Sequence, residues 1–266
     1  MSKDTRKPTL RKKALARTLI AAAADRTAIE PLTNAHPDLD PTTAYEIQDA
    51  VVRARVEAGA VVVGAKLGLT SAAKQQQMNV SEPLYGFLTD DMQVDAGETL
   101  VCSDYIQPRC EPEVAFLLGR DLAGPQVTAA HVLAATELVF PAVDILDSRF
   151  SGYKFTLTDV IADNSSCAGF VLGGQGVDPR GFDLRLVGCV LEKNGRLVAT
   201  AAGAAVLGHP AASVAWLVRR LAQRGRGLAA GQVVMAGALT EAVAVSPGDT
   251  VVARFDRLGT VEIACR

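Results

Sequence analysis

The spacing of apolar and polar residues divides the chain into a helical first part and a strand-rich remainder. Apolar residues recur at helical intervals within 14–24 and again within 47–54. A capping-box pattern at Thr43 predicts the start of the second helix, and Gly59 predicts its end. We therefore expect residues 1–60 to form a helical N-terminal region.

Beyond residue 60 the pattern changes to short apolar runs bounded by turn residues. The runs predict strands at 60–69, 111–118, 142–146, 184–193, 196–202, 232–236, 250–255 and 260–264. Asn194-Gly195 predicts a hairpin turn between two of them. Helices are predicted at 71–78, 128–139 and 209–223. Because helices and strands do not alternate regularly, we expect an α+β fold, with a mixed β-sheet roll in a β-rich domain over 61–266.

Composition excludes several classes of protein. The 266 residues are 49% hydrophobic and 21% charged, and the formal net charge of -2 gives no bias toward nucleic acid or anionic membranes. No apolar run reaches the ~18–20 residues that span a bilayer. The apolar run after the basic start is too short and too broken for a signal peptide. Five cysteines without a C-x-x-C pair indicate free thiols in a reducing compartment, so we expect a cytoplasmic protein without nucleic-acid or membrane partners.

Three carboxylates occur within predicted strands. Glu111 and Glu113 are two residues apart and therefore share one face of a strand, and Asp144 interrupts the apolar run at 141–146. Three carboxylates suit a hard divalent ion such as Mg²⁺ or Mn²⁺. The alternative places Glu111 and Glu113 on a solvated strand face, but Asp144 is costly to bury without a partner. Spacing alone leaves both interpretations open.

Lys66 interrupts another apolar strand, in the run VVVGAKLGL at 61–69. A lysine there is expected to face a carboxylate or a polar cavity, where it binds an acidic substrate or acts with a lowered pKa. The alternative is an edge-strand lysine whose ammonium group extends to water. The polar segment 159–167 suggests a loop that lines a site, whereas Asx turns at Asp163 and Asn164 would explain it without any function.

Seven stretches carry a resemblance to known enzymes. They are GAKLGLTSAAKQQQM (64–78), EPLYGFLTDDM (82–92), QPRCEPEVAFLL (107–118), PAVDILDSRF (141–150), DVIADNSS (159–166), GAAVLGHP (203–210) and AGALTEAV (236–243). Together they resemble the 2-keto-4-pentenoate hydratase and 4-oxalocrotonate decarboxylase group of the fumarylacetoacetate hydrolase superfamily. The resemblance extends from Ala14 to the end of the chain. It implies a β-sheet roll of the fumarylacetoacetate hydrolase C-terminal-domain type, with 61–266 as the catalytic domain.

The resemblance also implies roles for individual residues. A divalent ion, Mg²⁺ or Mn²⁺, is expected on the carboxylates of Glu111, Glu113 and Asp144. Asp144 stands where relatives usually have glutamate, and it would bind either directly or through a water. Lys66 corresponds to the active-site lysine of the family and is expected to be catalytic. Substrate contacts are expected from Leu69, Leu84 and Ser166.

The segment around Leu84 favours one reaction of the family over another, since hydratase-like relatives carry an acidic residue at this position. We expect metal-dependent decarboxylation of 4-oxalocrotonate (2-oxo-3-hexenedioate) to 2-hydroxypenta-2,4-dienoate in an aromatic meta-cleavage pathway. Two alternatives stay open: a 2-keto-4-pentenoate hydratase, and a non-catalytic partner subunit of that hydratase. The resemblance further implies a homo-oligomer that associates with the pathway hydratase.

Overall fold

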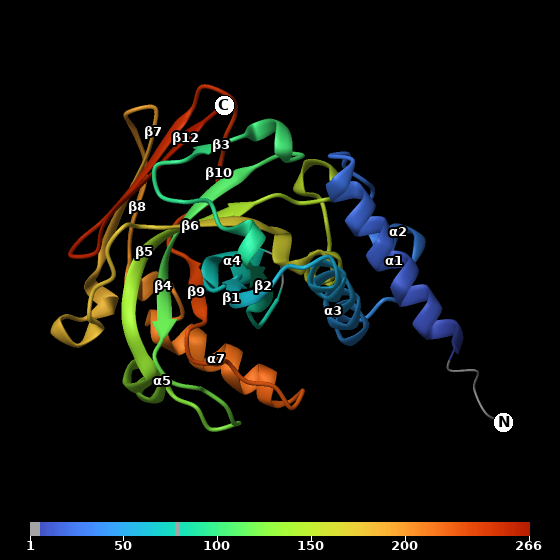
Figure 1. The fold of residues 1–266 in the computed structure, drawn as a ribbon, viewed down its shortest axis with the longest axis horizontal. Helices are drawn as coiled ribbons and strands as arrows, with labels where there is room; N and C mark the ends of the chain where they lie inside the picture. Colours follow the sequence, from blue (N-terminus) through green and yellow to red (C-terminus); the bar gives the residue numbers. More distant parts are fainter. Residues whose placement is uncertain (1–5, 78–79) are drawn as a thin grey trace.

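Two β-sheets pack against each other, and helices surround them (Figure 1). The computed structural model describes residues 6–77 and 80–266. One sheet has the order β2-β1-β9-β4-β5-β6, with β10 paired to β4, and the other has the order β3-β12-β11-β7-β8. Most neighbours are antiparallel, but β1 runs parallel to β9 and β3 runs parallel to β12. The expected α+β fold with mixed sheets is therefore confirmed.

The elements have the following bounds. The first sheet contains β1 (Val62–Gly68), β2 (Leu84–Thr89), β4 (Arg109–Leu118), β5 (Thr136–Leu146), β6 (Cys167–Leu172), β9 (Val233–Ala238) and β10 (Val243–Ala244). The second contains β3 (Thr99–Leu100), β7 (Gly188–Lys193), β8 (Arg196–Ala202), β11 (Thr250–Phe255) and β12 (Gly259–Cys265). The helices are α1 (Arg6–Ala24), α2 (Leu32–Ala35), α3 (Pro41–Glu57), α4 (Ala72–Gln77), α5 (Ala129–Ala135), α6 (Leu157–Ala162) and α7 (Pro210–Ala222).

Strand β4 separates the core from the site. Successive side chains of a strand point to opposite faces. Val114 and Phe116 of β4 join the large hydrophobic core between the two sheets, together with residues such as Leu191 and Ile263 of the second sheet. The odd-numbered residues at the start of β4 face the other way. Burial of one face of β4 in this core therefore fixes the direction of its charged face.

Several expected boundaries differ from those observed. The capping box at Thr43 is wrong, because Asp40 is the N-cap of α3 and its carboxylate accepts a hydrogen bond of 2.7 Å from the Thr43 N–H. The helix expected over 128–139 ends at Ala135, because residues from Thr136 onward pair with β4 as part of β5. The hairpin at Asn194-Gly195 is confirmed, and both residues have the positive φ that a type I′ turn requires.

The N-terminal helices pack on one end of the first sheet. Leu19 of α1 and Ile47 of α3 share a second hydrophobic cluster with Leu84 of β2 and Ile161 of α6. The buried Gln48 side chain donates hydrogen bonds to backbone carbonyl oxygens of β2 and α6. This cluster ties the helices to the sheet, and the domain boundary at residue 60 stays a prediction. None of the helices in the described part of the chain is both long and apolar enough to cross a membrane.

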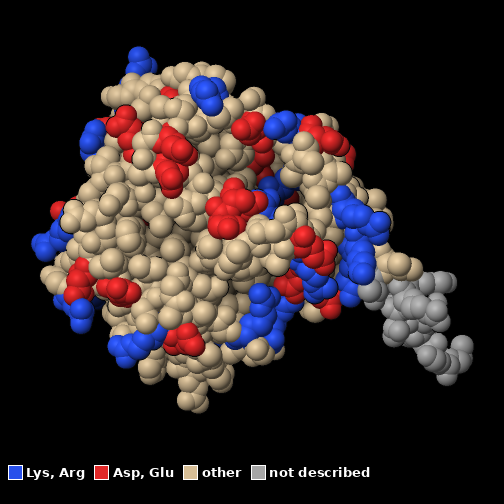
Figure 2. All heavy atoms as spheres, viewed as in Figure 1, with Lys and Arg blue, Asp and Glu red and all other residues tan. Residues whose placement is uncertain are grey.

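Charges of both signs occur on the surface. Figure 2 shows Lys and Arg interspersed with Asp and Glu over one face, and an acidic and a basic group adjoin near its centre. The five cysteines are buried free thiols. The polar segment expected to form a loop at 159–167 begins within α6 and continues into a short turn at Asn164–Ser166.

Candidate active site

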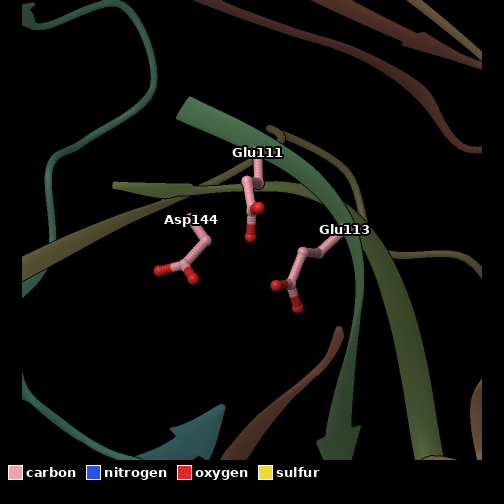
Figure 3. Close-up of side chains that lie close together, drawn as sticks. All are labelled: Glu111, Glu113 and Asp144. Atoms are coloured by element: carbon pink, nitrogen blue, oxygen red, sulfur yellow. The ribbon is translucent and has the colours of Figure 1, made fainter. Parts of the chain in front are cut away.

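Three buried carboxylates converge beside the first sheet. Glu111 and Glu113 lie on the same face of β4, and Asp144 lies directly opposite Glu111 in the pairing of β4 with β5. One carboxylate oxygen from each residue lies within 4.8 Å of the others, and Figure 3 shows the three side chains pointing toward one another. Glu113 and Asp144 are fully buried and Glu111 is 8% exposed. The alternative of a solvated strand face is therefore wrong.

Hydrogen bonds satisfy only part of this cluster. Lys66 Nζ donates to Asp144 Oδ2 at 2.8 Å, and Lys74 Nζ donates to Glu111 Oε1 at 2.7 Å. The Gly237 N–H donates to Glu113 Oε2 at 2.7 Å. Within the described residues, Glu113 Oε1 and Asp144 Oδ1 are buried and have no hydrogen-bond partner. Buried anionic oxygens without partners are costly, so the donor set fits a divalent cation.

The raised pKa values of the buried carboxyl groups indicate that a cation would stabilise the cluster. Burial raises the pKa of Glu113 well above its usual range, and the neighbouring Asp144 raises it further. Burial also raises the pKa of Asp144, although the Lys66 ammonium opposes that shift. A bound cation would favour the ionised form of both carboxyl groups.

Lys66 lies in the interior of the first sheet, because β1 pairs with β2 on one side and with β9 on the other. Its side chain is only 2% exposed, so the edge-strand alternative is wrong. The expectation of a lowered pKa is also wrong. Burial lowers the pKa of Lys66, but the attraction of Asp144 and the other carboxylates outweighs burial and places it above the ordinary value. Lys66 is therefore a fixed positive charge beside the triad.

A cavity of about 310 Å³ opens next to the triad. Lys66, Glu111 and the three expected substrate contacts, Leu69, Leu84 and Ser166, all line it. Glu113 and Asp144 lie behind this lining, in the protein interior. Most of the remaining wall is apolar, with side chains that include Leu146, Phe155 and Val160. The structure thus places all seven residues singled out from the sequence in or directly behind one cavity, and their roles stay predictions.

The serine-bearing turn is held by long-range contacts. Asn164, Ser165 and Ser166 all have positive φ, which is rare for residues other than glycine. Asn164 Nδ2 donates to the Phe87 carbonyl oxygen at 3.0 Å, and Asn164 Oδ1 accepts from the Phe87 N–H at 2.9 Å. The Asx-turn interpretation of Asn164 is therefore wrong. The turn places Ser165 and Ser166 on the cavity wall, and Ser166 Oγ is buried with no partner among the described residues.

Sequence reasoning missed other polar residues of the cavity. Lys74 on α4 and Arg109 at the start of β4 both line it. The guanidinium carbon of Arg109 lies 3.9 Å from the centre of the Tyr153 ring, which also lines the cavity. Arg109 precedes Glu111 by two residues, so the strand alternation that pairs Glu111 with Glu113 could have identified it.

The triad and its cavity lie within the segment that matches a known family. Residues 60–265 match the model for the fumarylacetoacetate (FAA) hydrolase C-terminal domain. The chain belongs to the fumarylacetoacetate hydrolase family. The expected roll of the family type is thus confirmed.

Relatives of two activities are similar to this chain. It is 44% identical to a 4-oxalocrotonate decarboxylase of Pseudomonas sp. (strain CF600), over 93% of this chain and 94% of the relative. It is 43% identical to a 2-keto-4-pentenoate hydratase of Paraburkholderia xenovorans (strain LB400), over 88% of this chain and 87% of the relative. Within its family the chain therefore belongs to the group of 4-oxalocrotonate decarboxylases and 2-keto-4-pentenoate hydratases. The near-equal identities do not distinguish between the two reactions.

A solved structure extends the similarity to three dimensions. The 4-oxalocrotonate decarboxylase from Pseudomonas putida G7, complexed with magnesium and adipate, superposes with a TM-score of 0.95. The two chains are 39% identical and each is covered completely. The magnesium and adipate belong to that protein. For this chain, the similarity shows that the described fold is that of the fumarylacetoacetate hydrolase family across its length.

Proposed function

We propose that this protein is a divalent-metal-dependent decarboxylase that converts 4-oxalocrotonate to 2-hydroxypenta-2,4-dienoate and CO₂ in an aromatic meta-cleavage pathway. The observation that carries the proposal is the combination of the carboxylate triad and Lys66 with an apolar cavity wall at Leu84. An apolar wall favours the change from a charged carboxylate to neutral CO₂. The magnesium and adipate, a six-carbon dicarboxylate, in the relative from Pseudomonas putida G7 support the same substrate class.

The triad would hold Mg²⁺ or Mn²⁺ through Glu111, Glu113 and Asp144, since two of its buried carboxylate oxygens have no hydrogen-bond partner among the described residues. When bound, the ion supplies Lewis-acid polarisation of the 2-oxo group of the substrate. Glu111 also lines the cavity, so the ion site and the substrate share one wall. Glu113 and Asp144, which are fully buried, keep their carboxylates fixed while the substrate enters and leaves.

The substrate is a vinylogous β-keto acid, which defines the electron flow. The bond to the distal carboxyl carbon breaks, and its electron pair moves through the double bond to the 2-oxo oxygen while CO₂ leaves. The charged Lys66, fixed beside Asp144, stabilises the negative charge that develops on that oxygen. A proton from solvent completes the enol of the product. Ser166 Oγ, which is free to donate a hydrogen bond, would orient the 2-oxo acid end.

Hydration of 2-hydroxypentadienoate is the second candidate, because hydratases are among the relatives at similar identity. Hydration requires an activated water and a proton relay. Leu84 and the leucine, phenylalanine and valine side chains of the lining cannot themselves supply either. A non-catalytic subunit is the third candidate, and the presence of the triad and of Lys66 argues against it.

Turnover by the purified protein separates the three candidates. Protein with Mg²⁺ is supplied with 4-oxalocrotonate and, separately, with 2-hydroxypentadienoate, and CO₂ release and ultraviolet absorption are followed. We expect CO₂ release from the first compound and little loss of the second. Rapid hydration without CO₂ release would support the hydratase, and no turnover of either compound would support the non-catalytic subunit.

The expected assembly belongs to the same proposal. We expect a homo-oligomer that also associates with the pathway hydratase, in the cytoplasm. Analytical ultracentrifugation of the protein alone and mixed with a 2-keto-4-pentenoate hydratase measures both associations. A monomer that sediments independently of the hydratase would contradict this part of the proposal.

A further inference from the structure

A third cationic side chain lines the cavity, and the mechanism above does not use it. Arg109 begins β4 and shares a face with Glu111 and Glu113, two and four residues further along the strand. Its side chain is partly exposed, whereas the triad is buried. Arg109 is therefore more accessible to solvent than the triad, and it lines the same cavity as Glu111.

The guanidinium group has a fixed support. It stacks on the ring of Tyr153, 3.9 Å from the ring centre. Tyr153 and the preceding Gly152 have φ values of 59° and 61° in a short turn over Ser151–Tyr153. The Gln107 side chain accepts a hydrogen bond from the Gly152 N–H and donates one to the Phe150 carbonyl oxygen. The stacked ring limits the rotamers of Arg109, so less conformational entropy is lost when an anion binds.

Arg109 differs from the other cations of the cavity in its partners. Lys66 and Lys74 each donate a hydrogen bond to a carboxylate of the triad. For Arg109, no hydrogen bond or ion pair of the guanidinium group is found within 6–77 and 80–266, although its planar donors match a carboxylate in geometry. A cation that is held by an aromatic ring, lines a cavity and forms no ion pair with the carboxylates of Glu111 and Glu241 in the same lining is suited to bind an anionic ligand.

We propose that Arg109 binds the second, distal carboxylate of a dicarboxylate substrate and thereby sets the preference of the cavity for dicarboxylates over monocarboxylates. The proposal rests on the proposed function, which places the 2-oxo acid end of the substrate at the triad. The backbone positions of Arg109 and Glu111 are separated by the rise of two strand residues, about 6.5 Å, and both side chains line the cavity, so a substrate held at the triad extends toward Arg109 along the charged face of β4. Arg109 thus acts in recognition of the carboxylate that is later released, while Leu84 and the other apolar side chains of the same cavity favour the loss of its charge as CO₂ leaves.

This role has a kinetic consequence. The ion pair with Arg109 stabilises the bound carboxylate and disappears as the carboxylate becomes neutral CO₂. Arg109 therefore strengthens ground-state binding more than the transition state. Removing its charge is expected to raise KM for 4-oxalocrotonate by roughly tenfold or more, while kcat is unchanged or higher. The partial exposure of Arg109 keeps the ion pair weak enough for release.

Binding of two matched ligands tests the proposal without turnover. 2-Oxoadipate and 2-oxohexanoate share the 2-oxo acid end and the chain length, and they differ in a terminal carboxylate against a methyl group. Neither has the double bond that decarboxylation requires. Isothermal titration calorimetry with Mg²⁺ present gives both dissociation constants for the wild-type protein, Arg109→Met, Arg109→Lys and the surface control Arg254→Met, whose arginine lies in the second sheet.

We expect the wild-type protein and Arg254→Met to prefer 2-oxoadipate by roughly 10- to 100-fold, the contribution of a hydrogen-bonded charge pair. Arg109→Met should lose that preference through weaker binding of 2-oxoadipate alone, and Arg109→Lys should keep part of it. The proposal is overturned if Arg109→Met retains the preference, if both ligands weaken equally, or if the wild-type protein has no preference.

The binding measurement and the turnover measurement can fail independently. A preference that depends on Arg109 in a protein that releases no CO₂ would contradict the proposed function and leave this inference standing. CO₂ release by a protein whose preference does not depend on Arg109 would do the opposite. Arg109→Lys keeps the test decisive if Arg109→Met does not fold.

Discussion

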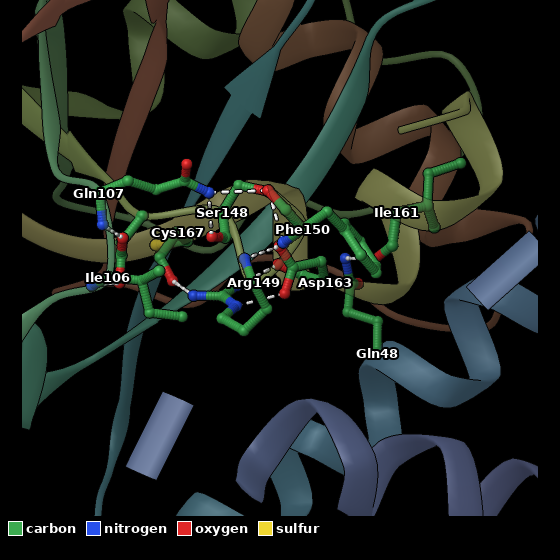
Figure 4. Close-up of polar contacts among 10 residues, drawn as sticks. Gln48, Ile106, Gln107, Ser148, Arg149, Phe150, Ile161, Asp163 and Cys167 are labelled. Carbon is green, nitrogen blue, oxygen red and sulfur yellow. Dashed lines mark hydrogen bonds and ion pairs between the residues drawn. The ribbon is translucent and has the colours of Figure 1, made fainter. Parts of the chain in front are cut away.

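Two buried clusters of charged residues lie near each other at the end of β5, and they differ in how their charges are satisfied. In the first, the triad, Glu113 Oε1 and Asp144 Oδ1 have no hydrogen-bond partner within the described residues. In the second, which we call the arginine cluster and which consists of Asp147, Arg149 and Asp163, every carboxylate oxygen accepts a hydrogen bond. Figure 4 shows the contacts of Arg149 with Asp163 and with the Cys167 carbonyl oxygen.

The arginine cluster supports the loops around the cavity. Asp147 accepts hydrogen bonds from the N–H groups of Ile106 and Gln107 at 2.9 and 2.7 Å. Arg149 forms an ion pair with Asp163, immediately before the serine-bearing turn. Burial raises the pKa of Asp163 to about 6, and the pairing with Arg149 opposes that shift. A fully satisfied buried cluster orders the backbone, whereas buried oxygens without partners indicate a place for a ligand.

Removing the metal should have the largest effect on turnover, and it should act on the triad and leave the arginine cluster unchanged. A chelator is expected to abolish turnover, and Mg²⁺ or Mn²⁺ should restore it, since the carboxylates alone cannot polarise the 2-oxo group. Thermal unfolding should shift upward with Mg²⁺ in the wild-type protein and not in Glu113→Ala. Full activity of the metal-free protein would contradict the metal site.

Breaking the arginine cluster should instead affect stability. Arg149→Met leaves the fully buried Asp163 without its cation, which is expected to lower the free energy of unfolding by about 3–5 kcal/mol. Urea denaturation measures this change. The matched control is Arg254→Met, which removes an exposed ion pair with Glu192 and should cost at most about 1 kcal/mol. Equal losses in the two variants would refute a structural role of the cluster.

Lys66→Met removes the fixed charge beside the triad and keeps much of the side-chain volume. We expect a folded protein with kcat lowered by roughly a hundredfold or more, because preorganised charge at the reacting oxygen is lost. Magnesium affinity, measured by calorimetry, should not fall, since the ammonium no longer repels the ion. Near-normal turnover by the folded variant would show that Lys66 is structural.

Leu84→Asp places a negative charge on the apolar wall. The charge repels the dicarboxylate substrate, so decarboxylation should fall by roughly tenfold or more at unchanged metal affinity. Leu84→Asn has a similar shape without the charge and serves as the control. Equal losses in the two variants would show that packing, rather than charge, determines the effect.

The smallest expected effect is a change in the free energy of unfolding that has opposite signs in the two clusters. In metal-free protein, Glu113→Gln replaces a buried carboxyl group, whose ionisation burial and Asp144 oppose, with a neutral amide, and it is expected to raise the free energy of unfolding by about 1 kcal/mol. Asp163→Asn removes the partner of Arg149 and should lower it. Chemical denaturation of both variants without metal gives the two signs. Destabilisation by Glu113→Gln as large as that by Asp163→Asn would remove the distinction between the clusters.

Local patterns predicted a large part of the fold from the sequence. The turn at Asn194-Gly195, the end of α3 near Gly59 and the strand that contains Lys66 all follow from short-range preferences of the chain. The helix expected over 128–139 ended early because the residues from Thr136 onward pair with β4, a contact that no local pattern specifies. Pairing with a neighbouring strand thus overrode the local helical signal.

In the candidate site, too, local sequence patterns predict some features and long-range contacts decide the others. The sequence by itself determined which carboxylates share a face of β4 and that a lysine interrupts an apolar strand, since alternation along a strand is a local property. Only the tertiary structure decided that Asp144 lies opposite Glu111, that Lys66 pairs with Asp144, and that Asn164 holds the serine-bearing turn against β2. These contacts depend on sheet register and on burial of the opposite strand face in the core, which arise from interactions between residues far apart along the chain.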